Sequence, residues 1–425
     1  MSAAIGAGLR YGALGLPLAF VALPLYVVLP NHYAEQFGVP LAALGGVLLA
    51  VRSLDALLDP WIGLRVDRLL SGPFSRTLRW LALAAAVLML GLTGLFFPLP
   101  ALRGELPALL AWCAALLLAT CLAWSVASVL HQAWGARLGG DDATQARRVA
   151  WREGAALVGV VLASVLPSLA GLPVSLTVFI VTLALGVLAL ARADRPVPEP
   201  DLPDTEAASP GPWQLPAFRR LLAVFMLNGI ASAVPATLVL FFIRDRLQLP
   251  QWEGAFLASY FLAGALSLPL WVRLVDRLGL VRAWGAGMVL AVLTFCGAVL
   301  LGEGDGRGFL LVCVASGLAL GADLALPGAL LAAVVRRSGL GGRAEGRFFG
   351  WWTAASKLNL ALAAGLALPL LQWAGYQPGS RDPQGLEMLG LTYALLPCVF
   401  KLMALALLWR LAGALPPTSL QGDPR

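Results

Sequence analysis

Charge is scarce in this sequence. Charged residues make up 12% of its 425 residues and hydrophobic residues 59%, whereas a soluble domain carries about 25% charged residues. The mean hydropathy is +0.82. These values exclude a soluble enzyme, a disordered chain and a disulfide-stapled secreted module. Apolar residues are spread evenly from Leu9 to Leu411, which also excludes a receptor with a single membrane-spanning helix.

Lysine and histidine are almost absent. Of the 30 basic residues only Lys357 and Lys401 are lysines, and the chain has two histidines. The five cysteines lie in apolar runs without CxxC spacing, so we interpret them as buried hydrophobic residues rather than metal ligands. No nucleotide-binding loop, hydrolase motif or metalloprotease motif is present, and no basic stripe carries interleaved aromatics. The sequence therefore predicts neither an enzyme nor a nucleic-acid partner.

What the sequence does contain is a succession of apolar runs, each long enough to cross a bilayer. They predict an all-α membrane protein with twelve transmembrane helices in two pseudo-symmetric six-helix bundles. The runs cover residues 9–29, 41–64, 77–99, 106–134, 149–171, 172–192, 219–243, 253–275, 281–302, 308–334, 346–375 and 387–412.

Arginine sets the expected orientation. With the N-terminus inside, 22 basic residues fall on the cytoplasmic side and five outside, which predicts that both termini are cytoplasmic. The Pro-rich and acidic segment 193–218 is expected to be a linker between the bundles 1–192 and 219–413, and 414–425 to be a tail. We expect a monomeric, multi-pass protein of the bacterial inner membrane, with the lipid bilayer and a small-molecule substrate as its partners.

The two halves of the chain share a repeat. Residues 60–69, PWIGLRVDRL, match residues 269–278, PLWVRLVDRL, at five positions with one fixed offset. Both copies fall at the expected cytoplasmic end of the second helix of their half. Internal repeats of this kind are typical of secondary transporters, whose substrate site lies between the repeats near the midplane. The motif predicts a conformational latch made of Gly63, Asp67, Arg68, Asp276 and Arg277.

Few charges lie inside the expected spans, where each is costly. Asp55 and Asp59 are spaced i, i+4, and Arg52 shares their helix face. Two neighbouring carboxylates in an apolar site either share a proton or hold a cation, which is the chemistry of a coupling-ion site. The alternative is a structural Arg–Asp pair with one spare acid near the membrane interface.

The remaining intramembrane polar residues are also candidates. Lys357 lies near the expected bilayer centre, and a lysine, unlike an arginine, can lose its proton, so it can act as a movable counter-charge. Asp323 and Lys401 are equally deep, and either pair with each other or line a cavity. Trp124, inside the fourth run, is either a stacking platform or a packing residue.

Two stretches carry a family resemblance. They are Arg52-x-x-Asp55-x-x-x-Asp59-Pro60-x-x-Gly63-x-x-x-Asp67-Arg68, and Glu345-Gly346-Arg347-Phe348-Phe349-Gly350 with Lys357. The chain resembles the glycoside–pentoside–hexuronide:cation symporters, the melibiose-permease branch of the major facilitator superfamily. The resemblance implies that Asp55 and Asp59 bind the coupling cation and that Lys357 lies beside cation and sugar. It also implies that Trp124 and Arg152 face the sugar.

The chain departs from that family at three positions. Ala19 and Thr120 stand where melibiose-type members carry carboxylates that accept sugar hydroxyls, and Leu58 stands where an Asn often precedes the second cation Asp. One oxygen ligand for Na⁺ is lost, so H⁺ suits the site at least as well. The more apolar cavity would also suit an amphiphile, and animal members of this branch carry lysolipids.

The sequence thus predicts a cation-coupled symporter of a small solute, a sugar or glycoside, working by alternating access. One alternative is a symporter or flippase for an amphiphile such as a lysolipid, and another is a non-transporting membrane sensor or scaffold. No cofactor is expected beyond the coupling ion, H⁺ or Na⁺, and no metal site beyond a Na⁺ at Asp55 and Asp59. Substrate-binding candidates are Ala19, Thr120, Trp124, Arg152 and Lys357, and an intramembrane charge network is expected at Arg52, Asp323 and Lys401.

Overall fold

A computed structural model describes residues 2–196, 210–377, 379 and 381–412, and this described part is helical without any strand. Half of the predicted linker 193–218, residues 197–209, lies outside the described residues, as does the predicted tail 414–425. A short 3₁₀ turn, η3 (Pro212–Gln214), precedes the first helix of the second half. The predicted all-α class is confirmed for the described chain.

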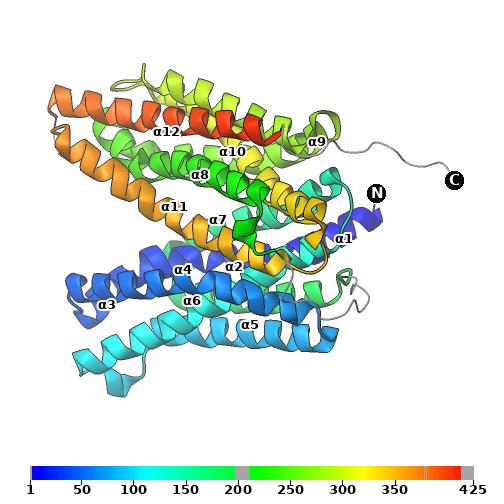
Figure 1. Cartoon of the computed structure of the whole chain (residues 1–425). Helices are drawn as coiled ribbons and strands as arrows, with labels where there is room; N and C mark the ends of the chain where they lie inside the picture. The colour runs from blue at the N-terminus through cyan, green and yellow to red at the C-terminus, as the bar shows by residue number, and fades with distance from the viewer. Residues whose placement is uncertain (1, 197–209, 378, 380, 413–425) are drawn as a thin grey trace. The chain divides into compact units, whose positions relative to one another are not determined.

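The described residues form twelve α-helices and six shorter helical turns, whose arrangement Figure 1 shows. The first half contains α1 (Ser2–Gly12), α2 (Gly15–Phe20), η1 (Pro24–Val28), α3 (Leu29–Phe37), α4 (Leu41–Leu70), α5 (Phe74–Phe96), η2 (Pro100–Leu102), α6 (Leu106–Arg137) and α7 (Asp142–Ala191). The second half contains α8 (Pro216–Phe241), η4 (Phe242–Arg246), η5 (Pro250–Trp252), α9 (Glu253–Ala298), α10 (Gly306–Val335), η6 (Arg336–Leu340), α11 (Glu345–Trp373) and α12 (Pro383–Ala412).

The first predicted helix, 9–29, is not one continuous element. It is divided among α1, α2 and the π-helical turn η1, with α3 following. The physical reason is local, because Pro17 and Pro24 lack the N–H that an uninterrupted helix requires. Leu14, Val21 and Leu23 at the junctions keep right-handed helical dihedrals, so the segment is an irregular helix, and its crossing of the membrane stays a prediction.

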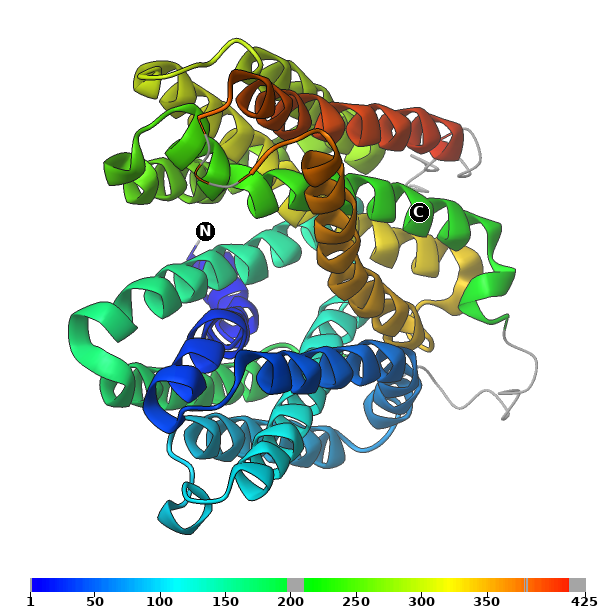
Figure 2. The same cartoon turned by 90° about the vertical axis from the view of Figure 1, so that its left-hand side faces the viewer.

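Glycines break two of the long helices where the sequence places span boundaries. Gly171 in α7 has φ +82° and Gly279 in α9 has φ +75°, which are left-handed values that glycine adopts without strain. Figure 2 shows the two arms of α7 meeting at a bend. The predicted boundaries between 149–171 and 172–192, and between 253–275 and 281–302, coincide with these breaks.

Within the described residues, nine helical segments are long and apolar enough to cross a membrane. They begin at Phe74 and include both arms of α7 as separate segments, whereas Pro250–Ala298 is a single segment of 49 residues that contains the break at Gly279. α4 is not among them, and it carries three aspartates and three arginines. The chain is thus a multi-pass membrane protein by its helices.

The chain forms two compact units. Unit 1 comprises Met1–Ala207, Leu268–Asp276 and Leu324–Leu358, and unit 2 comprises Ala208–Ser267, Arg277–Asp323 and Asn359–Arg425. In unit 1, α6 packs against both α4 and α5, and α2 packs against α7 (Figure 1). In unit 2, α8 packs along α12, and an aromatic core includes Phe242 stacked on Tyr393 at 4.3 Å. The predicted division into bundles at a linker stays a prediction.

Candidate functional site

α4 presents two carboxylates to the interior of unit 1. Asp55 and Asp59 are 2% and 0% exposed, because their i, i+4 spacing puts both on the buried side of the helix. Arg52, one turn earlier, is exposed. The buried face of α4 thus carries both of these acids.

Lys357 of α11 lies between these two carboxylates. Its Nζ atom is 2.6 Å from Asp55 Oδ2 and 2.8 Å from Asp59 Oδ2, and it donates a hydrogen bond of 2.9 Å to Asp59 Oδ1. One ammonium group thus contacts both acids. The three residues that the resemblance assigns to cation coupling form one cluster in the structure.

Ser125 of α6 completes this coupling cluster, by which we mean Asp55, Asp59, Ser125 and Lys357. The buried Ser125 hydroxyl donates to Asp55 Oδ1 at 3.1 Å and accepts from Lys357 Nζ at 2.8 Å. Beside it, the ring of Trp124 has its centroid 5.5 Å from Lys357 Nζ, within range for a cation–π contact. The Trp124 Nε1–H donates to the carbonyl of Leu18 at 2.7 Å, which fixes the indole plane.

The cluster exists because α4 and α11 touch at their backbones. A Cβ on Gly350 would lie 2.6 Å from the Asp59 carbonyl oxygen, and a Cβ on Gly346 would lie 2.5 Å from that of Gly63. Such distances are impossible for any larger residue, so glycine is required on both helices. The close approach brings Lys357, two turns beyond Gly350, within reach of Asp59.

Asp67, the acid of the predicted latch, binds the start of α11. Its carboxylate accepts hydrogen bonds from the backbone N–H groups of Gly346 at 2.7 Å and Arg347 at 2.9 Å. A carboxylate there also interacts favourably with the helix dipole. Arg137, at the end of α6, donates to Asp67 at 3.0 Å and to Glu345 at 3.0 Å, so that α4, α6 and α11 are tied at one point.

Other members of the predicted latch lie elsewhere. Arg68 is exposed, and the cations that form ion pairs with Asp67 are Arg137, at 3.0 Å, and Arg347, at 3.5 Å. Asp276 and Arg277, the repeat copies of Asp67 and Arg68, are exposed too, so the second copy does not reproduce the buried contacts of the first. The reason is that the sequence match preserves the residue types but not the helix end against which Asp67 packs.

A second set of ion pairs in unit 1 involves the start of α7. Arg336 and Arg337 of η6 each donate to a different oxygen of Asp142 at 2.8 Å. The preceding residue, Asp141, caps α7 by accepting from the Thr144 N–H at 2.9 Å. Hydrogen bonds from the Thr144 side chain and backbone lower the pKa of the exposed Asp141 carboxyl below its usual value.

The three remaining substrate candidates differ in how buried they are and in whether their polar atoms are already bonded. Ala19 is half-buried in α2. Thr120 is fully buried, its hydroxyl donates to the Leu116 carbonyl at 2.7 Å, and the side chain packs on Gly91 of α5. Arg152 is half-buried and forms an ion pair with its neighbour Glu153 at 2.6 Å.

Asp323 and Lys401 pair with each other in unit 2. The ammonium group of Lys401 binds Asp323 Oδ2, to which the Ser232 hydroxyl also donates at 3.2 Å. Asp323 Oδ1 accepts from Trp284 Nε1 at 3.0 Å and from Asn228 Nδ2 at 3.1 Å, and Lys401 donates to Asn228 Oδ1 at 2.8 Å. All lone pairs of the carboxylate are used, so this neutral network joins α8, α9, α10 and α12.

Sequence reasoning missed Ser125, Arg137 and Asn228 as contacts of these charges. Arg137 appeared only as one of many cytoplasmic arginines, and Ser125 and Asn228 are single polar residues in apolar runs. A search for polar residues inside the runs would have found Ser125 and Asn228 but not their partners. Glu345 lies in a stretch that carries the resemblance, although its pairing with Arg137 has no signal in the sequence.

The chain resembles known transporters. A family model described as MFS/sugar transport protein matches residues 10–412. One similar solved structure is a bacterial homologue of the iron transporter ferroportin in an outward-facing state, with TM-score 0.69 and 18% identity, covering 96% of this chain and 99% of that chain. Another is a variant of the E. coli fucose:proton symporter FucP, with TM-score 0.64 and 12% identity, covering 95% of this chain and 98% of that chain. The human organic anion transporter TETRAN has TM-score 0.64 and 17% identity over 95% and 99%. Identities this low show the fold alone, and a comparison with curated proteins finds no match.

Proposed function

The chain belongs to the MFS/sugar transport protein family, so it is a membrane transporter and not an enzyme, and we propose that it moves a small solute in symport with H⁺ or Na⁺. The observation that carries this proposal is the position of Lys357 within 3 Å of both Asp55 and Asp59. Ionisable side chains inside membrane helices are costly, and by default they mark substrate or ion pathways.

The charges of the coupling cluster support uptake of one cation. Two carboxylates and one ammonium group carry a net charge of −1 when all are ionised. One H⁺ or one Na⁺ brings this sum to zero and weakens the hold of the carboxylates on Lys357. In the mechanism we propose, the protein that holds substrate exchanges between its outward-open and inward-open states only when the cluster is neutral, so that substrate and one cation cross together.

We extend the proposal to topology. The arrangement that fits the arginine distribution has twelve spans in the bacterial inner membrane, with both termini in the cytoplasm. The breaks at Gly171 and Gly279 support it, since each divides one long helix into two lengths that can cross a bilayer.

A sugar or glycoside is the substrate we propose. Trp124 supports it, because an indole face held by its bond to Leu18 suits the apolar face of a pyranose ring, and it adjoins Lys357. The family description refers to sugar transport, and the similar FucP is a fucose:proton symporter.

A second candidate substrate is an amphiphile such as a lysolipid. Ala19 offers no polar atom, and the Thr120 hydroxyl is already bonded within its own helix and packed on Gly91. The two positions that would recognise sugar hydroxyls in melibiose-type carriers are thus apolar or occupied, which favours a substrate with an apolar part.

Substrate class and coupling ion can be tested together in proteoliposomes. Radiolabelled hexoses, β-glycosides and lysophosphatidylcholine would be offered under an inward Na⁺ gradient, an inward H⁺ gradient or no gradient. The proposal expects accumulation of one class under one gradient. Uptake that reaches only equilibrium under every gradient would contradict symport, and no uptake of any class would favour a sensor or scaffold.

A further inference from the structure

Four exposed arginines gather where α4 ends and α5 begins. Arg65 and Arg68 lie three residues apart near the end of α4, and Arg76 and Arg79 lie three residues apart at the start of α5. Residues at this spacing share a helix face. Only residues 71–73 separate the two helices, so we call these four side chains the hairpin patch.

The hairpin that carries the patch is tight. The Thr77 hydroxyl of α5 donates to the Leu69 carbonyl of α4 at 2.7 Å. A Cβ on Gly72 would lie 3.4 Å from the Arg68 carbonyl oxygen and 4.0 Å from Arg76 Cδ, which puts the Arg76 side chain beside the last turn of α4. The basic turns of both helices are therefore held next to each other.

Within the part of the chain that the structure describes, carboxylates do not balance the charge of the patch. Among the described residues, no carboxylate lies within ion-pair distance of the four arginines, and Arg79 Nε donates only to the Ser75 carbonyl at 3.3 Å. Asp67 sits between Arg65 and Arg68 in sequence but is buried and bonded to Arg137. Four positive charges thus face solvent or headgroups together.

Apolar side chains continue the patch along both helices. Leu57 and Trp61 of α4 are 74% and 65% exposed, and Trp80 and Leu83 of α5 are exposed as well. In a multi-pass membrane protein such surfaces face acyl chains, and tryptophans concentrate at the headgroup level. The basic patch therefore adjoins an apolar surface that is suited to contact lipid tails.

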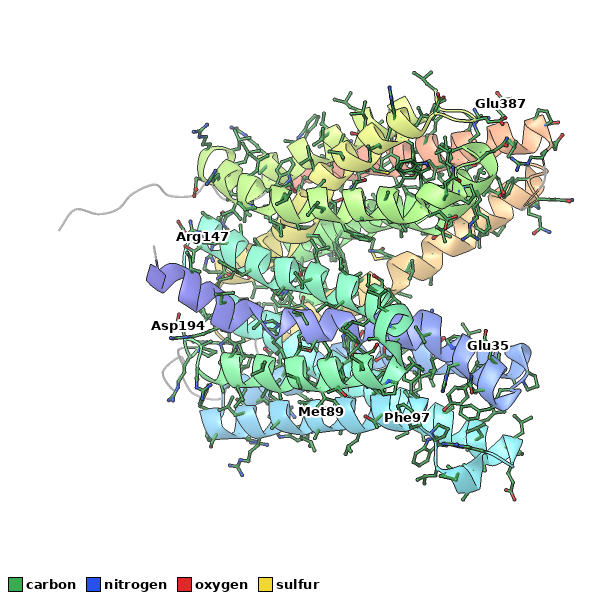
Figure 3. All side chains as sticks on the ribbon, turned by 180° about the vertical axis from the view of Figure 1, so that it is seen from behind. Glu35, Met89, Phe97, Arg147, Asp194 and Glu387 are labelled. Carbon is green, nitrogen blue, oxygen red and sulfur yellow. The ribbon has the colours of Figure 1, made fainter. Side chains whose placement is uncertain are left out.

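The patch lies at one end of unit 1. Arg195, the residue after Asp194, places its guanidinium 4.4 Å over the ring of Phe74 at the start of α5. Figure 3 shows Asp194 and Arg147 at one end of unit 1, and Phe97, which follows the last residue of α5, at the opposite end. The arginines of α5 are thus at the end that the sequence assigns to the cytoplasmic leaflet.

We propose that the hairpin patch binds the headgroup of an anionic diacyl phospholipid. Guanidinium groups bind phosphate oxygens through paired hydrogen bonds, and basic clusters beside spanning helices attract anionic lipids. A nucleic acid or a phosphopeptide would match the charge but would leave the apolar surface below uncovered. The occupied patch stabilises the end of α4, from which Asp67 reaches α11, and this proposal does not depend on the coupling ion or the substrate.

Thermal unfolding of the purified protein in neutral-detergent micelles tests the proposal. Dioleoylphosphatidylglycerol, dioleoylphosphatidylcholine or soluble glycerol phosphate would be added to wild type, to the double variants R65Q/R68Q and R76Q/R79Q, and to the control R192Q/R220Q. The control removes two exposed arginines that lie outside the patch. Each double variant removes only half of the patch, so the test needs only one of the two variants to fold. Native mass spectrometry would count the lipids bound to each protein.

Phosphatidylglycerol is expected to raise the Tm of wild type and control equally, and that of each patch variant by at most half as much. High salt is expected to reduce the shift, because it screens exposed charges. Equal shifts in all four proteins would overturn the proposal, as would an equal shift with phosphatidylcholine. A shift with glycerol phosphate matching that with the lipid would overturn the assignment to a membrane lipid.

Discussion

At the scale of single residues, the coupling cluster depends on one ammonium group. Lys357 is held by Asp55, Asp59 and Ser125, and its charge offsets one of the two carboxylates. Removing a lysine from a buried ion pair leaves uncompensated charge, whereas replacing one of two acids leaves a balanced pair. Substitutions of the lysine and of an acid in this cluster should therefore differ in their effect on stability.

Lys357→Met is expected to lower the Tm more than Asp59→Asn does. The first leaves two buried carboxylates without their shared cation, at a cost of about 3–5 kcal/mol, and the second leaves Asp55 paired with Lys357. Scanning fluorimetry of both variants and of the wild type gives the order of their Tm values. If the Tm of Lys357→Met equals or exceeds that of Asp59→Asn, the ammonium group does not hold the acids together.

The cap of α7 gives a prediction that depends on pH. Asp141→Ala removes the acceptor for the Thr144 N–H and is expected to cost about 1 kcal/mol at pH 7. Since the pKa of Asp141 is lower in the folded than in the unfolded chain, the cap contributes fully above the unfolded value, about 4. The contribution disappears as the pH falls through the folded pKa.

Thermal unfolding of wild type and Asp141→Ala at several pH values would measure this difference. The gap between the two proteins should be widest at neutral pH and close on acidification below about pH 4. A gap that stays constant over this range would mean that the carboxylate charge does not contribute to the cap.

At the scale of elements, the crossing of α4 and α11 fixes the geometry of the cluster. Glycines on both helices permit backbone contact, and Asp67 binds the free N–H groups at the start of α11. Because a helix end offers unpaired donors, a carboxylate there acts as an anchor. The crossing thus sets the position of Lys357 relative to Asp59.

Gly350→Ala is expected to lower the Tm and impair transport, because its Cβ would lie 2.6 Å from the Asp59 carbonyl oxygen. Gly365→Ala provides the control on the same helix, since nothing lies within 4 Å of a Cβ there. The control should be neutral or slightly stabilising, because alanine is favoured over glycine in helices. Similar effects of the two substitutions on Tm and uptake would argue against backbone contact at Gly350.

The network of unit 2 is expected to behave as a structural joint between its helices. Lys401→Met leaves the Asp323 charge unpaired and should destabilise by about 3–5 kcal/mol, and adding Asp323→Asn should restore much of that loss. The double variant should retain gradient-driven uptake. A double variant that is as stable as wild type yet loses coupling would instead assign Asp323 and Lys401 to the transport step.

At the scale of the whole molecule, sequence pattern predicts most of the helices and three of the four residues that form the coupling cluster. Long apolar runs and glycine breaks predict helices and boundaries because these depend on local chemistry, and i, i+4 spacing places Asp55 and Asp59 together. Contacts between distant segments are not local. Arg137 binding Asp67, Ser125 joining the cluster, and the exposure of Asp276 follow from packing that one sequence does not encode in any short pattern.

The most direct test of the account is uptake by Asp59→Asn in proteoliposomes, compared with wild type under the same cation gradient and with no gradient. Neutralising Asp59 leaves Asp55 and Lys357 balanced without a bound cation. The account predicts that the variant equilibrates substrate downhill or by exchange but no longer accumulates it against its gradient. Accumulation by Asp59→Asn to the wild-type level would contradict coupling through this cluster.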